Sequence, residues 1–320
     1  MKSTSELTDF YYKTLHPVLE ELEKEREQIK YRVITVGVIY TLVIGFACLA
    51  LYSAMPDVQV FVFAAFAYIG GGGLIYKFLI KDYTSEFKEK IISPLIKAMD
   101  ENLNYSAYSH INTSHFTRSK IFNTQVDRVS GNDYVHGKVN DVAIQFSDFH
   151  AEKKHKDSKG RTSWSTIFQG LFIVSDFNKN FHGSTIVLPD TAQSTFGDFI
   201  GGWLQSNNIS REALIKMDDP EFEKAFVVYG SDQIEARYIL SHSLMQKLLL
   251  FKKRSKEDIF VSFTNNNVNL AIAYNRDLFE PSVFSSLLKY KIAMEYVQPL
   301  HLAIGIVEEL NLNTKLWSKL

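Results

Sequence analysis

Residues 33–55 read VITVGVIYTLVIGFACLALYSAM, and residues 58–76 read VQVFVFAAFAYIGGGGLIY; only Pro56 and Asp57 separate them. Neither stretch contains a charged residue. At 1.5 Å per residue the first would form about 34 Å of α-helix, enough to cross a hydrocarbon core of about 30 Å. The second continues in apolar character to residue 80 around Lys77. We therefore expect a transmembrane helical hairpin over residues 33–80, because buried helices of soluble proteins rarely run this long without charge.

The flanks of the two stretches predict their orientation. The turn between the two stretches contains no Lys or Arg. The basic residues before the first stretch are Lys24, Arg26, Lys30 and Arg32, and those after the second are Lys77, Lys81, Lys88 and Lys90. Loops rich in Lys and Arg are retained on the cytoplasmic side. We expect a multi-pass membrane protein that contacts lipid and has both termini in the cytoplasm.

Four glycines, Gly70 to Gly73, lie inside the second stretch. In lipid, small residues let helix backbones approach closely. Two interpretations remain open: packing of the two helices within the hairpin, and association between chains. A transport pathway is disfavoured, because neither stretch has a central ionisable residue.

The composition of the whole chain narrows its class. The chain has 320 residues, with 35 Lys and Arg against 36 Asp and Glu, so it is not a strongly basic DNA-wrapping protein. Hydrophobic residues make up 46%, which excludes a disordered chain. The single cysteine, Cys48, excludes an internal disulfide and a cysteine-based zinc site.

Amphipathic helices are expected at both ends of the chain. The first, within residues 6–32, has a coiled-coil-like apolar stripe of Tyr11, Leu15, Val18 and Leu22. The last begins at Ser282, is interrupted at Pro299, and continues with Leu300, Ile304, Val307 and Leu310. Each stripe should bury itself on something, because helices this short are marginal alone. We predict that the two stand near each other and form a partner-binding or self-association site; a helix lying on its own domain is the alternative.

The remaining sequence predicts an α+β architecture. Pro94 should kink or restart the juxtamembrane helix that follows the hairpin. Strands are predicted where apolar residues alternate, over 142–149, 164–175, 184–188 and 226–229, with a further hairpin over 259–263 and 268–274. Asp219 and Ser241 are predicted helix caps. The expected domains are a cytoplasmic helix (1–32), the transmembrane hairpin (33–80), a juxtamembrane helix (82–106), an α+β domain (107–281), and a C-terminal helix and tail (282–320).

A basic hairpin is predicted around the turn at residues 157–160. Its basic and aromatic residues are Lys153, Lys154, Lys156, Lys159, Arg161 and Trp164. Such a hairpin can touch anionic lipid headgroups or nucleic acid, or it can simply be a charged, solubilising edge. Lipid is favoured over nucleic acid because the domain is tethered to a membrane. His150 and His155 should not share a metal, because positions five apart on a strand point to opposite faces.

No recognised catalytic constellation appears in the sequence. It contains no nucleophile elbow, phosphate loop or zinc-protease motif. Asp232, Glu235 and Arg237 form a charged cluster, either a buried arginine–carboxylate brace or an acid–base pair. We expect no cofactor and no metal.

The part of the chain that follows the predicted hairpin resembles a known family. The stretches that carry the resemblance are residues 166–172, residues 176–181, residues 187–190, the run DPEFEKAFVVY at 219–229 and the run DQIEARYIL at 232–240. They are similar, over about residues 80–285, to the bacterial membrane protein family called domain of unknown function 3137. The resemblance implies a membrane hairpin ahead of the domain, the bacterial inner membrane as location, and partners such as LemA-type membrane proteins, but no activity. Phe168, Phe172 and Gly170 within these motifs look structural, Gly170 because it suits a close backbone approach or a bulge.

Two classes of function remain. The first is a membrane-anchored cytoplasmic interaction or scaffold protein, which the hairpin and the absence of a catalytic motif favour. The second is a membrane-tethered enzyme or small-ligand sensor. A pocket with converging polar groups would favour the second class.

Overall fold

The computed structural model describes residue 6 and residues 10–176, 182–190, 213–274 and 276–309. The chain divides into two compact units. We call the first the sheet unit (Ile96–Leu278 and Tyr296–Leu320) and the second the helical unit (Lys2–Leu95 and Phe279–Glu295). The helical unit is therefore built from two stretches of chain that are far apart in the sequence.

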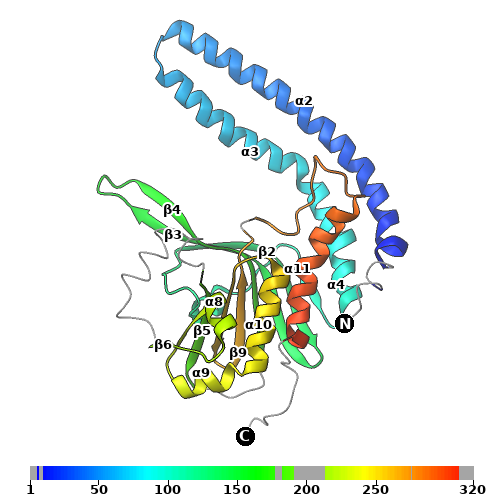
Figure 1. Ribbon diagram of the computed structural model, residues 1–320. Coiled ribbons are helices and arrows are strands. Elements are labelled where there is room, and N and C mark those ends of the chain that lie inside the picture. Colours follow the sequence, from blue (N-terminus) through cyan, green and yellow to red (C-terminus); the bar gives the residue numbers. More distant parts are fainter. Residues whose placement is uncertain (1–5, 7–9, 177–181, 191–212, 275, 310–320) are drawn as a thin grey trace. The chain divides into compact units, whose positions relative to one another are not determined.

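Two long helices form an antiparallel hairpin in the helical unit (Figure 1). A short π-helix η1 (Tyr11–Leu15) leads directly into α2 (His16–Ala54), so no break separates the N-terminal amphipathic segment from the apolar one. The return helix α3 (Gln59–Phe87) continues into the π-helix η2 (Lys88–Ile92) and then α4 (Ser93–Met99). Both long helices are apolar and long enough to cross a membrane by length and composition, and their most apolar windows are unburied.

The two long helices contact each other through polar aromatic side chains. The Tyr40 hydroxyl donates to the Ala67 carbonyl at 2.7 Å, and the rings of Tyr40 and Tyr68 stack with centroids 5.6 Å apart. A Cβ atom on Gly71 would overlap the Tyr40 hydroxyl oxygen, so a larger residue there would displace the Tyr40 side chain. Gly71 therefore serves packing within the hairpin, while association between chains stays a prediction.

A segment from the second half of the chain completes the helical unit. We call residues 279–289 the strap. Arg26 on α2 donates to the Val283 carbonyl at 2.7 Å, and the Leu287 N–H donates to Glu23 at 2.9 Å. These two backbone groups, four residues apart, would bond to each other in an α-helix. The helix predicted from Ser282 is therefore wrong, because two side chains of α2 take its hydrogen bonds.

The last helix begins only after the strap. It is α11 (Tyr290–Glu309), and it continues through Pro299 without a break. The predicted interruption at Pro299 is therefore wrong. The kink predicted at Pro94 coincides with a real irregularity, since the π-helical turn η2 ends immediately before α4 and its proline.

The sheet unit contains a nine-stranded antiparallel sheet among its described residues, in the order β1-β2-β3-β4-β9-β8-β5-β7-β6. The strands are β1 (Asn104–Ser106), β2 (Arg128–Val139), β3 (Val142–Lys156), β4 (Thr162–Asp176), β5 (Ser184–Pro189), β6 (Ala213–Ile215), β7 (Phe226–Gly230), β8 (Ile259–Thr264) and β9 (Asn267–Ile272). The helices are α5 (Thr113–Arg118), α8 (Pro220–Ala225), α9 (Gln233–Ile239) and α10 (His242–Ser255). The predicted strands and the α+β class are confirmed, and Asp219 and Ser241 cap α8 and α10 as expected.

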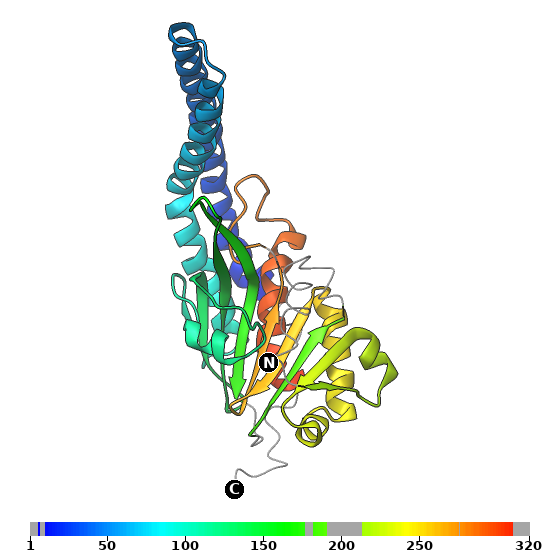
Figure 2. The same ribbon diagram turned by 90° about the vertical axis from the view of Figure 1, so that its left-hand side faces the viewer.

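Helices cover both faces of the sheet. α10 and α11, the latter from Tyr296 onward, lie against one face, and the segment containing α5 lies against the other (Figure 2). On the α5 face, Phe116 stacks on Phe149 at 4.8 Å between centroids and meets Phe172 at 5.2 Å. Phe168 and Phe172 are fully buried in this core. A Cβ atom on Gly170 would overlap the Ile272 carbonyl oxygen, which confirms the predicted close backbone approach.

Candidate functional site

The hairpin of β3 and β4 extends beyond the rest of the sheet (Figure 1). The last register pair that β3 makes with β2 is Glu152 with Arg128, and β4 pairs with β9 only from Leu171 onward. Residues 153–156 of β3 have no strand partner except residues 162–165 of β4, although the Lys154 N–H also donates to the Asp127 carboxylate at 2.8 Å. We call residues 153–165 the arm. Because a two-stranded hairpin is only marginally stable in water, contact with another surface would stabilise the arm.

The base and the tip of the arm are both shaped by local backbone features. At the base the register shifts, so that Ile167 is an extra residue of β4 between the pairs Ala151–Phe168 and Glu152–Thr166. Such a bulge bends the strand and so sets the direction in which the arm projects. At the tip, one carboxylate oxygen of Asp157 accepts hydrogen bonds from the backbone N–H groups of Lys159 and Arg161, at 2.9 and 2.8 Å.

One face of the arm combines cations with an aromatic ring. The Arg128 guanidinium lies 4.1 Å from the centre of the Trp164 ring, and the Lys154 ammonium lies 5.8 Å from it. Arg128 also donates two hydrogen bonds to Glu152, at 2.6 and 2.7 Å, and these lower the pKa of Glu152. Trp164 remains 38% exposed. The stacked guanidinium therefore orients the indole without covering it.

The structure brings the predicted basic residues together, all within the arm. Five basic residues stand against one acidic residue there, and the carboxylate of that residue, Asp157, is occupied by the turn. Sequence reasoning missed Arg128, which belongs to another strand. Neither Arg128 nor Glu152 lies in a strand range predicted above, and the register that joins them depends on a bulge between Asn132 and Val135.

Histidines near the arm bind neighbouring hydroxyls. His150 contacts the Thr166 hydroxyl at 3.0 Å, and His155 contacts the Ser165 hydroxyl at 2.7 Å. Within the described part of the chain no group of three or more His, Cys, Asp or Glu side chains is placed to hold a metal ion.

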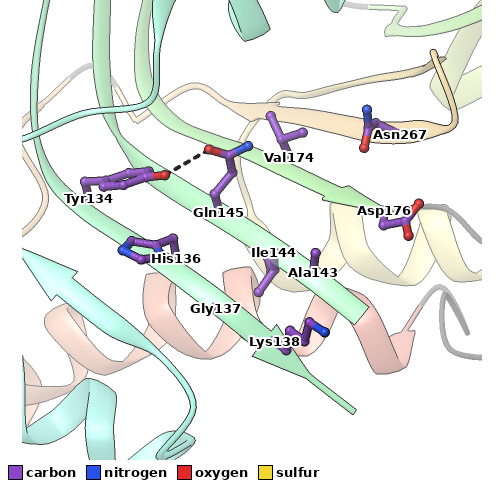
Figure 3. A pocket seen from close by; sticks show the side chains of 10 residues that line it. All are labelled: Tyr134, His136, Gly137, Lys138, Ala143, Ile144, Gln145, Val174, Asp176 and Asn267. Carbon is purple, nitrogen blue, oxygen red and sulfur yellow. Dashed lines mark hydrogen bonds between the residues drawn. The ribbon is translucent and has the colours of Figure 1, made fainter. Parts of the chain in front are cut away.

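A shallow hollow of about 400 Å³ lies on the sheet (Figure 3). Its lining residues are Tyr134, His136, Gly137, Lys138, Ala143, Ile144, Gln145, Val174, Asp176 and Asn267. The Tyr134 hydroxyl donates to Gln145 at 3.1 Å, and the rings of Tyr134 and His136 stack at 5.2 Å. Burial raises the pKa of Tyr134, so the phenol stays protonated. The hollow thus offers hydrogen-bonding groups on an open surface.

The apolar stripes predicted as a helix interface are placed in different units. In the helical unit Leu15 and Leu22 are buried and Val18 is half-buried; the side chain of Tyr11 lies outside the described part of the chain. In the sheet unit Leu300, Ile304 and Val307 are fully buried, and Leu310 lies outside the described residues. Pairing of the two stripes and their use in self-association stay predictions.

The charged cluster before α10 is not the buried brace that was one of the two arrangements expected from the sequence. Asp232 is exposed and caps α9 by accepting from the N–H groups of Ile234 and Glu235. Glu235 accepts from the backbone of His182 and Gly183, and Arg237 donates to the Lys216 carbonyl. Because Asp232 and Arg237 are both exposed and all three side chains bond to backbone groups, the predicted buried brace is wrong.

Comparison with known proteins finds one family model that matches part of the chain. The family model described as "Protein of unknown function (DUF3137)" matches residues 166–312, which confirms the family resemblance and moves its range toward the C-terminus. No curated protein matches the chain. A solved structure described as the crystal structure of the mycobacterial trehalose monomycolate transport factor A, TtfA, is similar at 11% identity, over 67% of this chain and 93% of that chain, with a TM-score of 0.34. Similarity at this level supports no statement about function.

Proposed function

Residues 166–312 belong to the DUF3137 family of unknown function, and from this premise we propose that the protein is a membrane-anchored interaction protein with its sheet unit in the cytoplasm. The observation that carries the proposal is the contrast between the two units. The helices α2 and α3 expose their apolar windows, whereas the sheet unit buries most of its large apolar side chains in cores on both faces. Exposed apolar helices of this length are stable in lipid and not in water.

The proposed orientation follows from charge. Basic residues lie on both sides of the hairpin and none lies at its turn, which favours retention of both ends in the cytoplasm. The expected location is the bacterial inner membrane, with two spans. Interaction is favoured over catalysis because the described residues offer a projecting arm with exposed cations and an aromatic ring. The partner is a membrane protein, for which a LemA-type protein is one candidate, or a second copy of the chain.

A small-ligand sensor is the second candidate function. The hollow lined by Tyr134, His136 and Gln145 favours it, because polar groups from neighbouring strands line a single concave surface. Its shallowness and openness make this candidate the weaker one.

Cysteine labelling in intact cells tests the orientation. In a Cys48→Ala background, Asp57→Cys should react with a membrane-impermeant thiol reagent from outside, and Ser158→Cys should react only after the cells are opened. Ser158 is preferred to Gly160, whose φ of +76° does not suit a cysteine. The reverse pattern of labelling would refute the proposed orientation.

A pull-down from native detergent tests the interaction. The tagged full chain should recover the same membrane protein repeatedly, and a variant with glutamines at the five basic positions of the arm should recover less of it. A control variant, Arg118→Gln with Lys120→Gln, changes exposed basic residues outside the arm and should recover the wild-type amount. Recovery of no protein above an untagged control would contradict the proposal.

A further inference from the structure

A second basic segment lies at the end of the sheet from which the arm projects. It consists of Lys252, Lys253, Arg254 and Lys256 at the C-terminal end of α10. The next strand, β8, starts at Ile259, which pairs with Ile272 of β9, and Ile272 pairs in turn with Leu171 of β4. The arm lies beyond Leu171 in the same direction. Two interstrand spacings of about 4.8 Å therefore separate this end of β8 from Leu171, roughly 10 Å, and the arm begins six residues, about 20 Å, farther along β4.

Part of the second segment has a structural role. Lys252 donates to the Ala225 carbonyl at 3.0 Å and lies 5.0 Å from the centre of the Phe226 ring. Cations also stabilise the negative end of a helix dipole. The contacts with Ala225 and Phe226 explain the position of Lys252, but they do not involve Lys253 and Lys256, both of which are exposed. The segment therefore carries more positive charge than the helix end uses.

The two basic segments share one side of the sheet. Side chains alternate along β3, so Lys154 and Lys156 point to the same face as Phe146. Phe146 pairs with Ile173, and Ile173 faces away from the Phe172 core that α5 covers. That opposite face is the one against which α10 lies (Figure 2). The cationic, aromatic face of the arm and the basic end of α10 thus lie on the same side of the molecule.

We infer that the arm and the C-terminal end of α10 together form a binding surface for the anionic headgroups of membrane phospholipids. The inference rests on the proposed function, because anchoring by α2 and α3 keeps this surface close to a bilayer and so raises the effective lipid concentration. Each Lys or Arg near an anionic leaflet favours contact, and Trp is enriched at the membrane interface. A single-stranded nucleic acid would instead require several stacking rings, and Trp164 is the arm's one aromatic residue.

Hydrogen exchange of the full chain in lipid nanodiscs tests the inference. We expect the backbone amides of residues 153–165 to exchange several-fold more slowly in discs that contain anionic phosphatidylglycerol than in discs of zwitterionic phosphatidylcholine alone. High salt should remove the difference, because it screens exposed charges. Lys253→Gln with Lys256→Gln should reduce the ratio of lipid-bound to free arm in the anionic discs, by roughly fivefold for each charge removed. Arg118→Gln with Lys120→Gln, at exposed positions beside Thr264 and Ser184 at the opposite end of β8 and β5, should leave it unchanged.

Three outcomes overturn the inference. Equal exchange of the arm in both lipids shows that it does not dock on anionic headgroups. The second outcome is that anionic lipid does not protect the arm, whereas an oligonucleotide or an acidic polypeptide, added to zwitterionic discs, does. The surface then binds another macromolecule and not lipid. Failure of the full chain to enter discs refutes the membrane anchor and the inference with it. A pull-down without a partner protein, by contrast, contradicts only the proposed interaction function and leaves lipid-dependent protection as support for this surface.

Discussion

Replacing Asp148 by asparagine should make the stability of the sheet unit less dependent on pH. Asp148 lies in β3 and is 3% exposed. Its carboxylate accepts hydrogen bonds from the N–H groups of Leu278, at 2.9 Å, and Phe149, at 3.1 Å. Burial raises the pKa of Asp148 to about 7, and the nearby carboxylates of Asp277 and Asp133 act in the same direction.

The sign and size of the effect follow from linkage. The folded state binds a proton on Asp148 more tightly than the unfolded chain, whose aspartates have pKa values of about 4. The free energy of unfolding therefore falls as pH rises through the window from about 4 to 7, by roughly 4 kcal/mol in total. Asparagine does not titrate, and its amide oxygen can still accept from Leu278. The stability of the variant relative to wild type should thus rise by about 2–3 kcal/mol between pH 5 and pH 8.

The measurement compares full chains in detergent by denaturant unfolding at several pH values, monitored by tryptophan fluorescence. The difference between variant and wild type removes the contributions of other carboxylates. Glu152→Gln is the control without pH dependence in this range, because Arg128 lowers the pKa of Glu152 and the stability that Glu152 provides is lost only as pH falls below about 4.5. A difference between Asp148→Asn and wild type that stays constant from pH 5 to pH 8 would refute the reasoning.

Three further predictions concern packing. Phe172→Ala should cost roughly 3–5 kcal/mol of unfolding free energy, since Phe172 is fully buried, and a loss below about 1 kcal/mol would show that β4 is not core; Phe284→Ala, at a side chain 56% exposed, is the control and should cost less than about 0.5 kcal/mol. Gly170→Ala should lower the thermal midpoint strongly, because its Cβ would overlap the Ile272 carbonyl, and an unchanged midpoint would mean that the strands can separate there. Arg26→Met should make the strap more sensitive to limited proteolysis, and wild-type cleavage rates would show that the Arg26–Val283 hydrogen bond does not hold it.

The sequence was most informative where local pattern and tertiary environment agree. Alternation over 142–149 predicted β3 because that strand has one face toward each core. Gly170 was recognised as a close-approach position without knowledge of the neighbour, which proves to be the backbone of β9. The helix caps Asp219 and Ser241 were readable because capping uses groups only two or three residues away.

Features that depend on distant partners were not readable. The strap has the apolar spacing of a helix, but Glu23 and Arg26 bind the backbone groups that its helical hydrogen bonds would need. The aromatic–cation face of the arm requires Arg128 to lie across from Glu152, and a bulge sets that register. β1 and β6 have three residues each, too few for a period of two to emerge.

The two-part composition of the helical unit has a consequence for how the protein is made. Arg26 meets Glu23 within its own helix, but its backbone partner at Val283 lies 257 residues later in the chain. During synthesis the hairpin is therefore made and ready for membrane insertion long before the strap leaves the ribosome. Most of the sheet unit is translated in between, but its last helix, α11, follows the strap in the chain. Both units therefore depend on chain made after residue 279, and a chain shortened before that residue would leave the helical unit without its strap and the sheet unit without α11.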